Sequence, residues 1–156
     1  MDQGWRRVPY KSIVGCVTGL VYDDGGRRAA GFRGDTRDCV TRAIAIATER
    51  DYRDVYDALN VAAQAKRGAA GSARTGLLRT VYQSWLESIG WRWYPTMKIG
   101  QGCTVHLRAD ELPPGRIIAR LSGHMCAVID GIVHDTGDPR RAGTRCVYGY
   151  FTQGDQ

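Results

Sequence analysis

The sequence lacks an apolar run long enough to cross a membrane. The apolar stretch over residues 12–22 is interrupted by Gly15 and Gly19, whereas a spanning helix needs about 20 consecutive, mostly apolar residues. The stretch also has no apolar segment in front of Cys16, so it does not match an export signal with a lipoprotein cleavage box. We therefore expect a protein that neither contacts a membrane nor is exported.

The sequence also lacks the closely spaced cysteine pairs of a zinc ribbon. Its five cysteines are an odd number and stand far apart, at positions 16, 39, 103, 126 and 146. This spacing predicts neither a disulfide framework nor a zinc site. We expect reduced thiols in a cytoplasmic protein, with core packing as the role of Cys16, Cys103 and Cys146.

The size and composition are those of one globular domain. The chain has 156 residues, of which 43% are hydrophobic and 24% are charged. We predict a single domain over residues 1–156, with residues 1–11 as a mobile or strand-like arm. The net charge of +6 is compatible with acidic partners such as nucleic acid, but the basic residues are scattered as on a solvated surface. The oligomeric state stays open.

Apolar periodicity predicts three helices followed by a sheet. The helices are expected at about 36–48, 51–66 and 78–89, with a small-residue loop at 67–76 that is a candidate lid. Strand patterns stand at 13–22, 91–94, 104–107, 116–121, 124–129, 132–135 and 145–151. Helices followed by antiparallel strands indicate an α+β domain.

Cys39 stands at the start of the first predicted helix, after the N-cap candidates Asp35, Thr36 and Asp38. A helix N-terminus lowers the pKa of a thiol, because the macrodipole and the free N–H groups favour the thiolate. A thiolate beside a histidine is a nucleophile suited to attack on an acyl carbon. Cys39 is therefore the candidate nucleophile.

His124 opens a strand pattern that is followed by a second one ending in Asp135. Between the two patterns, Asp130-Gly131 predicts a two-residue hairpin turn. Because side chains alternate faces along a strand, this turn puts His124 and Asp135 on one face as diagonal neighbours. Asp135 is thus the candidate to orient His124 and to favour its imidazolium form.

A cysteine at a helix N-terminus, followed by a histidine and an acid on successive strands, resembles the papain-like superfamily of cysteine peptidases and amidases. The matching pieces are Asp38-Cys39, Gly123-His124 and Asp135, and they span most of the chain. The segments 38–48 and 128–135 also resemble small phage and prophage proteins of unassigned function. The resemblance implies a papain-like α+β fold, with about three N-terminal helices packed on a C-terminal antiparallel sheet.

The same resemblance implies a thiol-dependent hydrolase or acyltransferase. Its substrate would be an amide, isopeptide or thioester bond in a protein or peptide. Cys39 would attack as the thiolate, His124 would take and return the proton, and Asp135 would hold the imidazole ring. No metal and no organic cofactor is implied.

The chain departs from the papain-like pattern in one respect. Those enzymes usually carry a glutamine shortly before the nucleophile, to donate a hydrogen bond to the oxyanion, and this chain has none between residues 3 and 64. The backbone N–H of Cys39 can serve instead. Arg33, Thr36 and Arg37 are the candidates for the second donor and for substrate binding.

Three other interpretations stay open. The missing glutamine favours a protein-binding module on the same scaffold without catalysis. Arginines and aromatic residues that alternate along the chain are compatible with a basic nucleic-acid-binding protein. Cys39, His124, Cys126 and Asp135 together have the residue types of a metal site, although their spacing matches no usual zinc motif.

Overall fold

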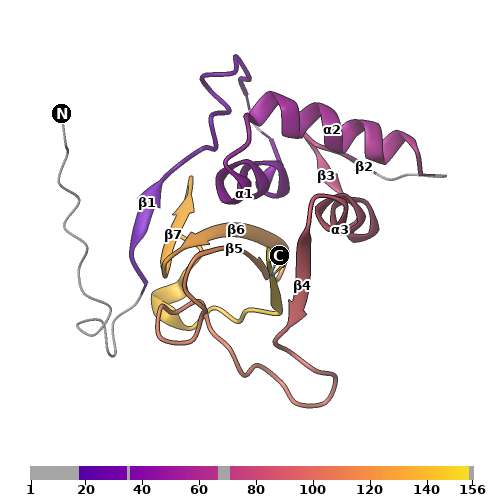
Figure 1. Ribbon diagram of the computed structural model, residues 1–156. Helices are drawn as coiled ribbons and strands as arrows, with labels where there is room; N and C mark the ends of the chain where they lie inside the picture. The colour runs from indigo at the N-terminus through magenta and orange to yellow at the C-terminus, as the bar shows by residue number, and fades with distance from the viewer. Residues whose placement is uncertain (1–17, 35, 67–70, 155–156) are drawn as a thin grey trace.

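The computed structural model describes residues 18–34, 36–66 and 71–154 (Figure 1). The helices are α1 (Cys39–Thr48), α2 (Tyr52–Gln64) and α3 (Arg79–Ser88), with a 3₁₀ turn at Arg141–Gly143. The strands are β1 (Leu20–Tyr22), β2 (Gly71–Ser72), β3 (Gly76–Leu77), β4 (Trp91–Pro95), β5 (Arg116–Leu121), β6 (His124–Ile129), β7 (Ile132–Asp135) and β8 (Gly149–Gln153). Within the described residues, no helix is both long and apolar enough to cross a membrane.

Six strands form one mixed sheet in the order β1-β7-β6-β5-β8-β4. All neighbouring pairs are antiparallel except β1 and β7, which run parallel. The predicted α+β class is confirmed, but the prediction of helices first and an antiparallel sheet afterwards is wrong. A strand precedes the helices, and it can pair in parallel with β7 because α1 to α3 and β4 to β6 lie between the two strands in the chain.

The sheet carries a hydrophobic core on each face. The three helices cover one face, and α1 lies over the middle of the sheet (Figure 1). Irregular segments around residues 105–112 and 147 cover the other face. Side chains of β5 alternate between the two faces and contribute to both cores. Ile118 packs under the helices, while Ile117 and Ala119 pack on the opposite side.

Local sequence signals determine the start of α2 and the end of α3. The Asp51 side chain accepts hydrogen bonds from the N–H groups of Arg53 and Asp54, and thus caps α2. Gly90 follows the last turn of α3 with a φ of +90°, which is the left-handed conformation that ends many helices.

The hairpin that carries the candidate histidine and acid has the predicted register. Asp130 and Gly131 both have positive φ, at +49° and +78°, as a type I′ turn requires. Ile129 is therefore paired with Ile132. This register places the start of β6 beside the end of β7, where the two candidate residues stand.

Several predicted elements differ in the structure. Residues 104–107 form no strand, and only one isolated bridge joins His106 to Cys146. The alternating pattern there reflects burial, because Leu107 packs into the second core and is fully buried. The last strand begins at Gly149 rather than at residue 145. The predicted arm at 1–11 and most of the predicted strand at 13–22 lie outside the described residues.

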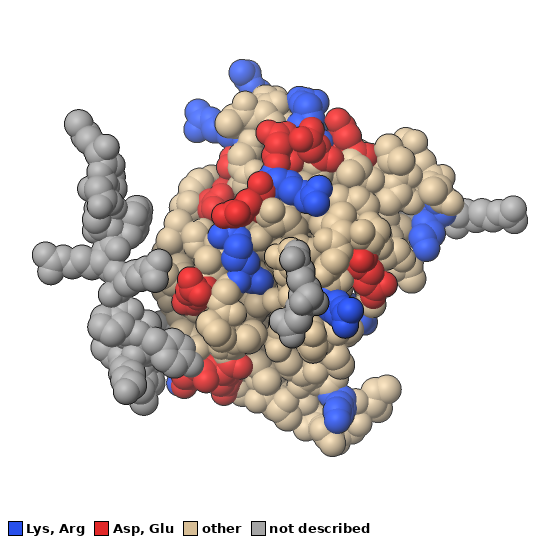
Figure 2. Space-filling view, viewed as in Figure 1, with Lys and Arg blue, Asp and Glu red and all other residues tan. Residues whose placement is uncertain are grey.

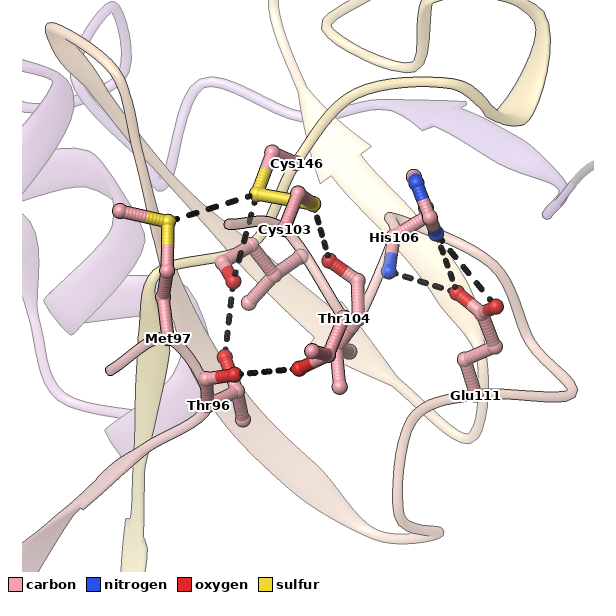
Figure 3. The surroundings of a disulfide bond; sticks show 9 residues. Thr96, Met97, Cys103, Thr104, His106, Glu111 and Cys146 are labelled. Carbon is pink, nitrogen blue, oxygen red and sulfur yellow. Dashed lines mark hydrogen bonds and ion pairs between the residues drawn. A yellow bond between two sulfur atoms is a disulfide. The ribbon is translucent and has the colours of Figure 1, made fainter. Parts of the chain in front are cut away.

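Cys103 and Cys146 form a disulfide, with their Cα atoms 5.9 Å apart and a sequence separation of 43 residues (Figure 3). The prediction that both are unpaired packing thiols is wrong. Their sequence spacing gives no signal, because the pairing depends on how two irregular segments lie against each other beside the His106 bridge. Among the described residues, Cys39 and Cys126 are the free cysteines, and Cys16 lies outside them.

We predict that the double variant Cys103→Ser/Cys146→Ser loses about 2–4 kcal/mol of unfolding free energy, because a cross-link over a long loop restricts the unfolded chain. Urea denaturation measures the loss. Dithiothreitol should bring the parent down to the double variant and leave the double variant unchanged. Rapid alkylation of both cysteines in the unreduced, folded parent would contradict the pairing.

Candidate active site

Cys39 is the first residue of α1 and lines an open cleft of about 630 Å³. The walls of this cleft come from the N-terminal end of α1 and the residues before it, from the β2–β3 hairpin, from α3, and from the turn between β5 and β6. His124 lines the same cleft. The structure thus brings the candidate nucleophile and the candidate base together from positions 85 residues apart in the chain.

His124 is held by a buried carboxylate. Its Nε2 lies 2.6 Å from Oδ2 of Asp135, which is 5% exposed. The other carboxylate oxygen, Oδ1, accepts the N–H of Thr136 at 2.7 Å and lies 3.6 Å from the guanidinium of Arg42. Since Asp135 occupies Nε2, the other ring nitrogen, Nδ1, is left to interact with Cys39. This is the arrangement that orients a general base.

The surroundings of Cys39 favour its thiolate. Burial by itself raises the pKa of the thiol, but the hydrogen bond and the charge of His124 act in the opposite direction. The backbone N–H of Met125 and the positive charge of Arg42 lower the pKa further. The net result is a pKa below the usual value for cysteine.

The histidine responds in the complementary direction. The hydrogen bond to Asp135 and the interaction with Cys39 raise the pKa of His124 to about 9, against the opposing effect of burial. Burial raises the pKa of Asp135, but the hydrogen bond and charge of His124 outweigh it, and the net pKa of this carboxyl is lowered. At neutral pH the histidine and the acid are therefore held as an imidazolium and a carboxylate, and the imidazolium favours the thiolate of Cys39.

Asp38 supports the site in a way that the sequence analysis missed. It occupies the N-cap position of α1, but its side chain makes no capping hydrogen bond. Instead the carboxylate, which is fully buried, pairs with Arg42, accepts the hydroxyl of Tyr52 and lies 3.4 Å from Arg27. The i, i+4 spacing of Asp38 and Arg42 is the sequence signal that could have indicated this pair.

The three candidate oxyanion residues have different positions. Thr36 and Arg37 line the cleft, whereas Arg33 does not. The Thr36 hydroxyl and the Arg37 backbone N–H both donate to the carbonyl of Arg74, at 2.7 and 3.0 Å. In the described part of the chain, no acceptor takes the N–H of Cys39, which leaves it as the candidate oxyanion donor.

The described part of the predicted lid lines the cleft and is hydrogen-bonded to the neighbouring helices. Residues 67–70 lie outside the described residues, and 71–77 form a small hairpin. Ala73, at the turn of this hairpin, is 1% exposed. Its carbonyl accepts the Thr41 hydroxyl at 2.8 Å, and its N–H donates to Asn60 at 2.8 Å. These bonds tie the hairpin to both α1 and α2.

Cys126 packs in the second core, away from the cleft lining. Burial raises the pKa of its thiol. Within the described residues, no group of three or more His, Cys, Asp and Glu side chains is placed to hold a metal ion.

Charged side chains of both signs share the surface. On the face shown in Figure 2, described Lys and Arg residues lie between described Asp and Glu residues, over α2 and the segment before α1. This face presents no continuous basic stripe such as a nucleic-acid backbone follows.

Comparisons with known proteins give no relative: no family model, no curated protein and no solved structure matches this chain. The function of the chain is therefore inferred from the geometry of the site itself.

We predict that Asp38→Ala lowers the unfolding free energy by about 3 kcal/mol or more, because it removes the closer of the two carboxylates that pair with the partly buried Arg42 and leaves only Asp135 at 3.6 Å. Tyr52→Phe is the matched control, since it removes one hydroxyl contact with Asp38 and should cost only about 1 kcal/mol. Urea denaturation of both variants measures the difference. Equal costs would show that the Asp38–Arg42 pair contributes nothing beyond the tyrosine contact.

Proposed function

We propose that this chain is a papain-like thiol hydrolase or acyltransferase that acts on an amide, isopeptide or thioester bond of a protein or peptide. The observation that carries the proposal is the 2.6 Å contact between His124 and the buried Asp135, on a histidine that shares an open cleft with Cys39. A buried acid, a histidine and a thiol in this order are what nucleophilic acyl transfer requires.

The reaction follows from the protonation states. The Cys39 thiolate attacks the acyl carbon, a C–S bond forms, and the carbonyl electron pair moves onto the oxygen. When the tetrahedral intermediate collapses, the bond to the leaving group breaks and the His124 imidazolium gives that group its proton. Water or an amine then attacks the thioester while neutral His124 accepts its proton, and the thiolate leaves.

The oxyanion is expected to form at the N-terminus of α1. There the N–H of Cys39 and the helix dipole both stabilise negative charge. This donor belongs to the helix backbone, so it does not depend on the glutamine that papain-like enzymes usually carry. A non-catalytic binding module needs neither a buried carboxylate behind its histidine nor a thiol of lowered pKa.

We predict faster alkylation of Cys39 by iodoacetamide near pH 6 than of an ordinary thiol, because the lowered pKa increases the fraction of thiolate. His124→Ala removes the main cause of the lowered pKa and should slow the reaction at pH 6 about tenfold for each unit by which the pKa rises. Mass spectrometry from pH 5 to pH 9 reads each cysteine separately.

Cys126 is the internal control for this experiment. It is buried and the pKa of its thiol is raised, so it should label slowly in both proteins. Slow labelling of Cys39 in the folded parent, without dependence on His124, would contradict the enzyme proposal and favour a binding module.

A further inference from the structure

The charged side chains that line the cleft around Cys39 are all basic within the described part of the chain. Among the described residues that line it, the charged side chains are Arg37, Arg42, Arg120 and His124. The acids of the site, Asp38 and Asp135, are buried behind it. Positive charge therefore outweighs the single thiolate on the surface that a substrate meets.

Arg42 is already neutralised, because it pairs with both Asp38 and Asp135. Arg120 differs from it. Among the described residues no carboxylate lies within ion-pair distance of its guanidinium. A partly buried arginine without a carboxylate, facing an open cleft, has unused capacity to bind an anion.

Arg120 lies close to the nucleophile. It is the Cα partner of Met125 in the β5–β6 pairing, and both residues line the same cleft as Cys39. Tyr82 of α3 lines the same part of the cleft. The positive charge of Arg120 partly offsets the increase in the pKa of Tyr82 that burial causes, because the two side chains lie near each other. A guanidinium and a hydroxyl are thus available together beside Cys39.

We propose that Arg120, assisted by the Tyr82 hydroxyl, binds a carboxylate of the substrate next to the bond that Cys39 attacks. This inference rests on the proposed function and names its substrate class, a peptide with an acidic group beside the scissile bond. The carboxylate belongs either to an Asp or Glu side chain or to a chain terminus, since both present the same pair of oxygens to an arginine.

Iodoacetate and iodoacetamide test the proposal without a known substrate. Both reagents react in one step, in which the thiolate forms a C–S bond and iodide leaves. Iodoacetate carries a carboxylate where iodoacetamide carries a neutral amide. We expect the ratio of the iodoacetate rate to the iodoacetamide rate at Cys39 to exceed that of free glutathione by about five- to tenfold, the effect of one charge-assisted hydrogen bond. We expect Arg120→Gln to remove most of this excess and Arg120→Lys to keep part of it.

Arg92→Gln is the matched control. It makes the same change of charge on the exposed edge strand β4, outside the cleft lining, and should leave the rate ratio as in the parent. A parent ratio equal to that of glutathione, or a ratio that Arg120→Gln does not lower, would overturn the inference. Fast labelling by iodoacetamide in the same samples would still support the proposed function, so the two failures are distinguishable.

Peptides that slow the alkylation of Cys39 by iodoacetamide show whether Arg120 binds a side-chain carboxylate or a terminal one. The two peptides are acetyl-Ala-Asp-Ala-amide, which has only a side-chain carboxylate, and acetyl-Ala-Ala-Ala, which has only a terminal one. Protection by either peptide that is lost in Arg120→Gln supports the proposal and identifies the source. Failure of both to protect at millimolar concentration would contradict it.

Discussion

The ion pairs of Arg42 hold the site together. Its guanidinium stands between two buried carboxylates, Asp38 in front of α1 and Asp135 at the end of β7. Each carboxylate has a second partner, Tyr52 for Asp38 and His124 for Asp135. One cation thereby connects the helix that carries Cys39 to the hairpin that carries its base. Charges buried to this extent are tolerated only when they are paired, so the network fixes the distance between the two elements.

Other parts of the fold also hold α1 and the β6–β7 hairpin in place. The β2–β3 hairpin is bonded to Thr41 and Asn60 and supports the N-terminal end of α1 from outside. The register of β6 and β7, set by the turn at 130–131, brings Asp135 within reach of His124. The second core and the Cys103 disulfide stabilise the far face of the sheet. The cleft is therefore open to solvent while its reactive groups are held from behind.

The elements that the sequence predicts well are those with local causes. Apolar periodicity predicts α1 to α3, and the strand patterns with the Asp130-Gly131 turn predict β5, β6 and β7. The register of this turn also predicts the contact of His124 with Asp135. The features that the sequence does not predict depend on contacts between distant segments. The parallel pairing of β1 with β7 and the disulfide both require contacts between parts of the chain that share no pattern. Asp38 also shows that a residue suited to capping a helix can be taken by a stronger ionic partner.

The protonation state of His124 is the most direct test of this account. An NMR titration of the histidine rings in the parent and in Asp135→Asn would measure it. We expect His124 to titrate near pH 9 in the parent, because Asp135 and Cys39 stabilise the imidazolium, and to titrate closer to 6.5 in the variant. A parent His124 that titrates near 6.5 would contradict the thiolate–imidazolium pair on which the proposed chemistry depends.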